Sequence, residues 1–329
     1  MPKFSLSEAS NLAKEKLQKS GCSDENCIGI TDGILDAELS GIKSHGFHYL
    51  PIYCNHLKIG KIKGLAKISA EKISESALKV NADNGFAHTA INLGFSSLFD
   101  MCTNSGIASM SIYNSYNCGV LGFHTKRIAE KGFVGIGFTN APASIAPIGG
   151  KKAVVGTNPF SIAVPLDGEA AIIIDQSASV VAKSEISVRA KSGESIPEGW
   201  AFDAEGNVTT NAQEALKGTM APSGGYKGFG TGLLVEIFAA CIAGGNLGTQ
   251  ASSFAGEDGG PPGTGQFFIA INPEKFNSNY STSMKTLIES IIEQEGARLP
   301  GSKRRTSFQK NKDQDIEIND QLLERINQI

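Results

Sequence analysis

Residues 133–140 read Phe-Val-Gly-Ile-Gly-Phe-Thr-Asn, a short apolar run of the kind that forms a buried strand. Gly135 and Gly137 could open the Gly-x-Gly-x-x-Gly fingerprint of a Rossmann dinucleotide site. However, Asn140 stands where the third glycine belongs, and Ala141-Pro142 follows where that motif needs a helix. If the chain binds a dinucleotide, we therefore expect it to do so without the common doubly wound cradle.

Helices are expected towards both ends of the chain, and strands in the middle. Ser5 and Glu8 fit a capping box, which predicts a helix that ends near Gly21. Further helices are predicted at 24–40, 86–103, 122–131, 229–245 (buried), 284–292 (with a Lys285–Glu289 ion pair) and from 319 onwards. Strands are predicted at 107–112, 133–139, 160–164, 171–175 and 266–271. The basic stretch 301–315 is expected to be an exposed loop. We expect residues 1–75 with 280–329 to form a helical domain, and residues 76–279 to bind cofactor and substrate.

Composition excludes several classes of protein. The 329 residues carry a net charge of −3, which argues against an electrostatic nucleic-acid footprint. No stretch is long and apolar enough to predict a membrane span or a signal peptide. The six cysteines have no metal-binding spacing, so we expect reduced thiols, no metal site and a cytoplasmic location. Walker, His-Glu-x-x-His and nucleophile-elbow motifs are also absent.

A few short motifs carry residues suited to chemistry. His45, in Ser44-His45-Gly46, could exchange a proton near neutral pH, although a loop histidine with a local hydrogen bond fits the pattern as well. The Asn114–Gly119 run predicts either a turn or a site at the end of a strand. Asp175 ends an apolar strand and is either a site carboxylate or a helix cap. The polar residues in 139–150 and 156–159 could line a ligand or could form plain loops.

The segment Gly224–Gly230 places glycines and Lys227 before an apolar helical run. Free N–H groups, the helix dipole and a cation together favour a phosphate group. Close packing of a helix on a sheet is the alternative explanation for these glycines.

Taken in order, six motifs resemble the malate/L-lactate dehydrogenase family of the non-Rossmann type, which includes ureidoglycolate and sulfolactate dehydrogenases, diketogulonate reductase and Δ1-piperideine-2-carboxylate reductases. The motifs are Ser44-His45-Gly46, Pro147-Ile148-Gly149-Gly150, Gly156-Thr157-Asn158-Pro159, Ile196-Pro197-Glu198-Gly199-Trp200, Gly224-Gly225-Tyr226-Lys227-Gly228 and Arg298-Leu299-Pro300-Gly301. The resemblance implies an α/β chain of the α+β type, with a helical domain and a largely antiparallel, non-Rossmann NAD(P)-binding domain. It also implies a homodimer that moves a hydride between NAD(P)H and a small 2-oxo or 2-hydroxy acid.

The resemblance assigns roles to individual residues. His45 matches the proton donor and Ser44 its relay partner, with Glu185 or Asp175 setting the tautomer of the imidazole. Cofactor contacts are expected from Asn117, Cys118, Gly119, Asp175, Gln176, Ser177, Tyr226, Lys227, Gly301, Lys303 and Arg304. Substrate contacts are expected from His48, Tyr49, Thr157, Ala178 and Ser179. The basic run at 303–305 slightly favours NADP over NAD, because arginine pairs well with a 2′-phosphate.

The sequence departs from the family pattern at the substrate side. Tyr49 stands where many members carry the arginine that binds the substrate carboxylate, so that role passes to another cation; the candidates are Lys43, His48 and Arg127. Asn117 replaces a histidine found in many members. Glu185 matches an acidic residue of the imine reductases, which makes a Δ1-pyrroline/Δ1-piperideine-2-carboxylate reductase the alternative to a malate-, lactate- or sulfolactate-type dehydrogenase. A cofactor-binding protein that has lost catalysis is the third possibility.

Overall fold

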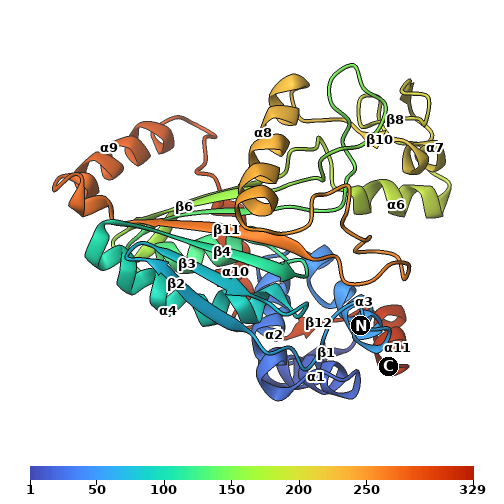
Figure 1. Ribbon diagram of the computed structural model, residues 1–329, viewed down its shortest axis with the longest axis horizontal. Helices are drawn as coiled ribbons and strands as arrows, with labels where there is room; N and C mark the ends of the chain where they lie inside the picture. The colour runs from blue at the N-terminus through green and yellow to red at the C-terminus, as the bar shows by residue number, and fades with distance from the viewer.

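The computed structural model describes residues 1–329, and a seven-stranded sheet forms its centre (Figure 1). The strand order is β2-β3-β4-β11-β5-β6-β7, and every neighbouring pair is antiparallel except β3–β4. The strands are β2 (Ser69–Ser74), β3 (Ala77–Asn81), β4 (Ile107–Ser115), β5 (Val134–Thr139), β6 (Phe160–Leu166), β7 (Glu169–Gln176) and β11 (Thr264–Ile271). The five predicted strands are confirmed, and so is the largely antiparallel sheet.

The two glycines of β5 serve packing. A Cβ on Gly135 would lie 2.7 Å from Ile128 Cβ, and one on Gly137 would lie 3.0 Å from the ring of Phe268. Ile128 belongs to α5 (Leu121–Ala129), which therefore lies directly on β5. The partial dinucleotide fingerprint thus reflects close approach of a helix to the sheet, and the prediction of a non-Rossmann fold is confirmed.

Helices cover both faces of this sheet. On one face, α4 (Ala87–Ser105) and α5 pack with β3, β4 and β11 in a cluster of 19 buried residues. On the other face lie α8 (Tyr226–Glu236) and the π-helical turn Ile237–Ile242, which follows it directly; Val235 and Ala239 there pack against Phe138 of β5. Figure 1 shows α8 above the sheet and α4 below it. The sheet is therefore covered on both sides, and its strand ends are left to build a site.

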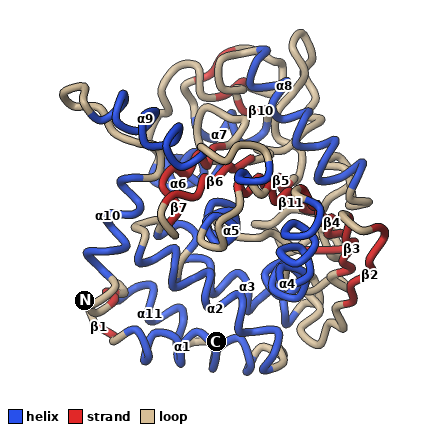
Figure 2. The backbone as a smooth tube through the Cα atoms, turned by 90° about the vertical axis from the view of Figure 1, so that its left-hand side faces the viewer, coloured by secondary structure: helices blue, strands red, loops and turns tan.

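The two ends of the chain meet in a helical layer. It contains α1 (Leu6–Lys19), α2 (Asp24–Leu39), α3 (Leu50–Lys58) and α11 (Asp320–Asn327), which share most of a core cluster of 21 buried residues. The capping box at Ser5 and Glu8 is present as predicted. Strand β1 (Lys3–Phe4) pairs with β12 (Ile316–Glu317), and Figure 2 shows both termini among these helices.

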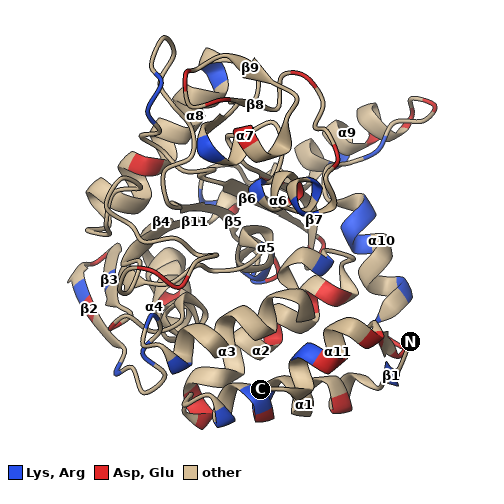
Figure 3. Cartoon of the chain, turned by 90° about the vertical axis from the view of Figure 1, so that its right-hand side faces the viewer, with Lys and Arg blue, Asp and Glu red and all other residues tan.

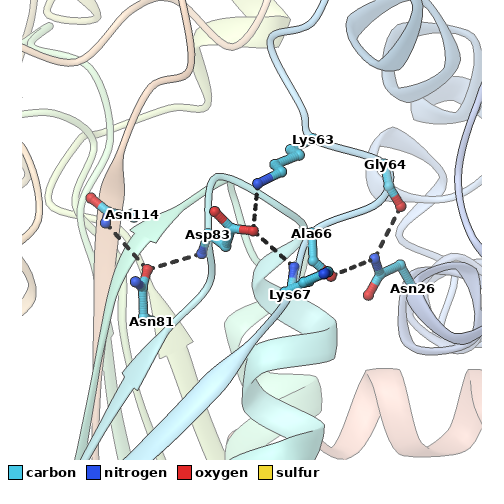
Figure 4. Close-up of polar contacts among 8 residues, drawn as sticks. All are labelled: Asn26, Lys63, Gly64, Ala66, Lys67, Asn81, Asp83 and Asn114. Carbon is cyan, nitrogen blue, oxygen red and sulfur yellow. Dashed lines mark hydrogen bonds and ion pairs between the residues drawn. The ribbon is translucent and has the colours of Figure 1, made fainter.

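A polar junction joins the helical layer to the sheet, as Figure 4 shows. Asp83 accepts hydrogen bonds from Lys63 Nζ (2.7 Å) and from the backbone of Lys67 (2.8 Å). Asn26, at the start of α2, donates to the carbonyl oxygens of Gly64 (3.0 Å) and Ala66 (3.1 Å). Asn81 Oδ1 accepts from Asp83 N and from Asn114 Nδ2. These contacts fix the ends of the parallel strands β3 and β4 against α2.

A third group of elements was not predicted. It comprises α6 (Lys183–Ser192), α7 (Ala212–Lys217) and a small sheet of β8 (Ala201–Phe202), β9 (Val208–Thr209) and β10 (Thr219–Met220). A cluster of 10 buried residues holds it together. None of the helices in the molecule combines the length and apolar character needed to cross a membrane.

Three local predictions were wrong. The stretch 301–315 is mainly a helix, α10 (Ser302–Asn311), which lacks an apolar stripe and is held by contacts of its arginines and Phe308. The run 229–245 is not fully buried, because Leu233 and Leu234 are exposed. On α9 (Tyr280–Ile292), Lys285 pairs with Asp167 of the β6–β7 turn at 3.2 Å, and not with Glu289.

The expected division into two domains stays a prediction. Strand β2 lies within the large sheet, and α9 contacts the β6–β7 turn, so both borders of the expected helical domain touch the sheet.

Candidate functional site

Ser44-His45-Gly46 forms a tight 3₁₀ turn just after α2. Buried Glu38, on α2, accepts a hydrogen bond from the backbone N–H of Phe47 at 2.7 Å, and burial raises the pKa of this carboxyl group. A Cβ on Gly46 would lie only 2.1 Å from Glu38 Oε1, so a larger residue there would have to displace this buried carboxyl group. The turn is therefore positioned by α2, with Ser44 and His45 on its free side.

His45 has one ring nitrogen held and the other available. Its Nδ1 lies 3.0 Å from the hydroxyl oxygen of Ser44, whereas Nε2 makes no hydrogen bond within the chain. Burial lowers the pKa of His45, Asp175 opposes that shift, and Arg304 adds to it. At neutral pH the imidazole is therefore neutral and can exchange a proton through Nε2.

Asp175 brings three elements together, and its charge acts on the imidazole of His45. It lies near the end of β7, its carboxylate is paired with Arg304 at the start of α10, and its side chain is only 10% exposed. A Cβ on Gly122 would lie 2.8 Å from Asp175 Oδ2, so the first turn of α5 packs directly against this carboxylate. The basic start of α10 is visible in Figure 3. A strand end and the first turns of two helices thus meet at one point.

The Asn117–Gly119 turn presents an unused hydrogen-bond donor. Asn117 Oδ1 accepts from the backbone of Gly119 (3.2 Å) and from the hydroxyl of Tyr53 (3.1 Å), whereas its Nδ2 is buried without a partner. Buried amide donors are normally paired, so an orphan at this place suits a ligand acceptor. Cys118 is buried, and burial raises the pKa of its thiol to about 12, so this residue can offer a ligand only its backbone.

Residues 175–179 run past the start of α8. The backbone N–H of Ala178 donates to the carbonyl of Thr157, and the N–H of Ser223 donates to the carbonyl of Ala178, both at 2.8 Å. A Cβ on Gly228 would lie 2.9 Å from that same carbonyl. Packing therefore explains Gly228, and it also places exposed Lys227, which forms no ion pair, near the 175–179 segment.

Four other predicted residues lie nearby: Gln176, Ser177 and Ser179 belong to the 175–179 segment, and Tyr226 begins α8. Ser177 and Ser179 hydroxyls lie 3.0 Å apart, Gln176 is exposed at the end of β7, and Tyr226 is 70% exposed. The amides of the nearby loops have structural roles. Buried Asn158 donates to the carbonyl of Gly232 and to Glu236, so it anchors α8 and does not line a ligand site.

A cavity of about 360 Å³ adjoins the Asp175–Arg304 pair, and most of its lining residues were not predicted as site residues. Lys126 Nζ lies 3.5 Å from Asp36 Oδ1 and 4.3 Å from the ring centre of Phe308. Arg305 also lines the cavity and donates to the carbonyl of Ala171 at 3.3 Å. These residues come from α2, α5 and α10, so no local pattern in the sequence could have grouped them.

Of the residues considered for the substrate carboxylate, Tyr49 lies beside His45 and Arg127 does not. The ring of Tyr49 lies nearly parallel to that of His45, with ring centres 6.3 Å apart. Of the three cations offered in place of an arginine at this position, Lys43 and His48 are exposed, whereas Arg127 lies over the rings of Phe95 and Phe123 within the α4–α5 packing. The structure thus gives no support to Arg127 as a carboxylate ligand.

The assignments of Glu185, Gly301 and Lys303 also stay predictions. Glu185 pairs with Arg189 on α6 at 3.3 Å and makes no contact with His45. Gly301 packs against Ile173 of β7, and Lys303 is exposed beside Arg304.

Comparison with known proteins identifies the family. The sequence profile of the malate/L-lactate dehydrogenase family matches residues 4–327. The chain belongs to this family. It is 35% identical, over 98% of its own length and 96% of the relative's, to (2R)-3-sulfolactate dehydrogenase (NADP(+)) of Chromohalobacter salexigens. It is 30% identical, over 96% of this chain and 94% of the relative, to Δ1-pyrroline-2-carboxylate reductase of Ancylobacter novellus.

Solved structures agree with this assignment. Δ1-piperideine-2-carboxylate reductase from Pseudomonas syringae superimposes with a TM-score of 0.93 at 27% identity, covering 100% of this chain and 99% of that one. Sulfolactate dehydrogenase from Methanocaldococcus jannaschii gives 0.89 at 28% identity, covering 99% and 96%. The expected family and fold are confirmed, and the protein is an NAD(P)-dependent oxidoreductase that acts on a small molecule.

Proposed function

We propose that this family member transfers a hydride between NADPH and C2 of a small 2-oxo or 2-hydroxy acid, with His45 exchanging the proton. The observation that carries the proposal is the state of His45: Ser44 fixes Nδ1, Nε2 is free, and Asp175 with Arg304 sets the local charge. General acid–base catalysis needs a group of this kind within reach of the reacting oxygen.

The residues present fit a dinucleotide. The orphaned Nδ2 of Asn117, the N-terminal turn of α5 and unpaired Lys227 offer donors and positive charge, and the cavity beside Arg304 has room for one end of the cofactor. Bound NAD(P)H supplies the hydride. The protein's own part is to orient the cofactor and to hold the proton at His45 Nε2.

The protonation of His45 would depend on the direction of the reaction. For reduction, His45 has to be protonated and donates to the substrate oxygen; for oxidation, the neutral imidazole accepts the hydroxyl proton. Because burial favours the neutral ring, we expect this site to be well prepared for oxidation at neutral pH. Arg304 contributes to that preference, whereas Asp175 reduces it.

A cyclic imine is the second candidate substrate. It is supported by the similarity to the Δ1-pyrroline-2-carboxylate reductase of Ancylobacter novellus and by Glu185, which matches an acidic residue of the imine reductases. Oxidation of NADH and NADPH should be measured with pyruvate, oxaloacetate, sulfopyruvate, Δ1-pyrroline-2-carboxylate and Δ1-piperideine-2-carboxylate. Turnover of the oxo acids supports the main proposal, and turnover of the imines alone supports the second. Cofactor binding without turnover of either class would identify a protein that has lost catalysis.

We also propose a homodimer in the cytoplasm. Helix α9 buries none of its residues, and Leu287, Ile292 and nearby Phe276 are exposed, as are Leu233 and Leu234 of α8. Such apolar surface is typical of an interface between subunits. All six cysteines are free, and five of them are buried, which suits a reducing compartment. Light scattering on the protein and on Ile292→Glu tests the dimer: the variant should be monomeric.

A further inference from the structure

Lys61 holds its ammonium group inside the protein without a carboxylate partner. Its side chain lies just after α3 and is 1% exposed. Nζ donates to three backbone carbonyl oxygens, those of Ser253, Gly256 and Asp258, each at 2.8 Å. An ammonium group has three donors, so all of them are satisfied by one short loop.

This arrangement is that of a cation in a cage of carbonyl oxygens. Transfer of a charge out of water is costly unless polar groups replace the lost hydration, and here three carbonyl dipoles do so. Burial lowers the pKa of Lys61, and the charge of Asp258 opposes that shift. Without the ammonium group, three carbonyl oxygens would point at one another with nothing to bind them together.

Besides Lys61, few polar contacts hold this loop. Asn55 donates to Glu257 at 3.0 Å, and the hydroxyl of Ser253 accepts from the backbone of the two residues that follow Phe254. Residues 253–258 contain no helix or strand, and Ser253, Ala255, Glu257 and Asp258 are exposed. Its one apolar anchor is Phe254, whose ring lies 5.3 Å from that of Tyr116. Figure 1 shows this segment leaving the α8 side of the sheet and reaching α3 before it returns to β11.

The same loop contacts the residue beside the proposed acid–base group. The carbonyl of Phe254 accepts from the hydroxyls of Tyr49 (3.3 Å) and Tyr116 (3.4 Å). The loop is thus hydrogen-bonded to the ring that lies nearly parallel to His45. The position of the loop therefore contributes, together with the ring of Tyr53 at 4.8 Å, to how Tyr49 lies against His45.

We propose that Lys61 is a positioning residue: its ammonium group acts as a built-in monovalent cation that locks loop 253–258 onto Tyr49 and so shapes the substrate side of the site. The expected effect on turnover rests on the proposed function. The binding of loop 253–258 by Lys61, which we call the lock, does not depend on the reaction. It assigns to Lys61 no contact with substrate or cofactor.

The first test replaces Lys61 with methionine, which keeps most of the stem and removes the charge. We expect the KM for the substrate to rise about ten- to hundredfold, since small misplacements at a site have effects of this size. The Kd for NADPH, measured by fluorescence titration, should stay within about twofold, because the loop does not contact the predicted cofactor residues. Lys63→Met is the matched control, since exposed Lys63 pairs with Asp83 outside this loop; its loss affects the junction with α2 and should leave the KM for the substrate as in wild type.

The second test is chemical rescue. In Lys61→Ala, added n-propylammonium or ammonium should bind in the vacated carbonyl cage. The raised KM for the substrate should then fall most of the way back to the wild-type value. A cation of the wrong size and chemistry, tetramethylammonium, should have no such effect. Full activity of both variants without any added cation, or a failure of rescue in a folded Lys61→Ala protein, would overturn the proposal.

Hydrogen exchange separates the lock from the reaction. Amide exchange of residues 253–258 should be fast in Lys61→Met, slow in wild type and Lys63→Met, and slowed again by propylammonium in Lys61→Ala. This measurement works even if no substrate is turned over, so failure of the proposed function and failure of the lock give different results. Unchanged loop exchange in Lys61→Met would refute the lock, and a global rise in exchange would show that Lys61 supports folding alone.

Discussion

At the scale of single residues, the site depends on side chains that are held on one side and free on the other. Ser44 holds Nδ1 of His45, and Tyr53 with Gly119 holds the oxygen of Asn117. In both cases the opposite nitrogen has no partner within the chain. A buried or half-buried group fixed in this manner is already oriented for a ligand, which lowers the entropy lost on binding.

The first prediction concerns His45. His45→Ala should lower kcat about 10²- to 10⁴-fold and leave the Kd for NADPH nearly unchanged, as expected for a general acid. Because its folded pKa is lowered, the rate of reduction should fall as pH rises through a value below 6.5, whereas oxidation should fall as pH drops through the same value. Steady-state rates in both directions from pH 5 to 9 test this. A variant with near-normal turnover, or a flat profile for reduction, would remove His45 from the mechanism.

At the scale of elements, helices with a clear cap and a clear apolar period were predicted well, whereas α3, α6 and α7 were not predicted. Ser5 and Glu8 start α1, Gly106 ends α4 with a positive φ of 82°, and the five strands lie where their apolar runs predicted them. Helix α10 was missed because Phe308 is its only apolar residue, and contacts to β7 and Lys126 stabilise it instead of an apolar face. Tertiary contacts of this kind leave no local signal in the sequence.

The second prediction concerns the start of α8. Lys227→Ala should weaken NADPH and NADH binding alike, by about tenfold, because a lysine–phosphate contact is charge-assisted and the diphosphate is common to both cofactors. Lys191 of α6 is also exposed, and Lys191→Ala should leave both dissociation constants unchanged. Fluorescence titration provides the measurement. Equal behaviour of the two variants would mean that the glycines near Lys227 serve packing alone.

The third prediction concerns the choice between cofactors at α10. Arg304 is paired with Asp175, so its loss would also disturb His45; Arg305 lines the cavity and is bonded only to carbonyl oxygens. Arg305→Ala should therefore raise the KM for NADPH about tenfold and leave that for NADH unchanged, since only NADPH carries the 2′-phosphate. Arg325→Ala on α11 is the control. If both KM values of Arg305→Ala rise together, the arginine does not discriminate between the cofactors.

At the scale of the whole molecule, the site is built from parts that lie far apart in the sequence. His45 follows α2, Asp175 lies near the end of β7, and Arg304 lies at the start of α10. The ion pair joins the last two, and the charges of both act on the imidazole of His45. The motifs marked most of these residues one by one, through glycines and polar side chains at strand ends. The cavity formed by Asp36, Lys126 and Phe308 could not be predicted, because only the packing of three helices brings these residues together.

The fourth prediction concerns acid stability, which follows from the α4–α5 packing. His88 and His124 are fully buried, their rings are 5.3 Å apart, and Nδ1 of each has no partner. Burial lowers the pKa of His88 to about 3 and that of His124 well below 6.5. The unfolded chain therefore binds protons near pH 6.5 that the folded chain rejects. The free energy of unfolding should be at its highest above pH 6.5, and it should fall as the pH drops towards the pKa values of the folded chain.

The size of this effect makes it measurable before the carboxylates titrate. Between pH 7.5 and pH 5 each of these histidines should lower the free energy of unfolding by about 2 kcal/mol. Urea unfolding at several pH values gives the slope. The double variant His88→Gln/His124→Gln should be less stable at neutral pH and should lose most of the pH dependence in this range; the remainder comes from His45 and His56, whose pKa values burial also lowers. His48→Gln, at an exposed position, should keep most of the wild-type slope. If the double variant keeps the full slope, the acid sensitivity arises elsewhere in the molecule.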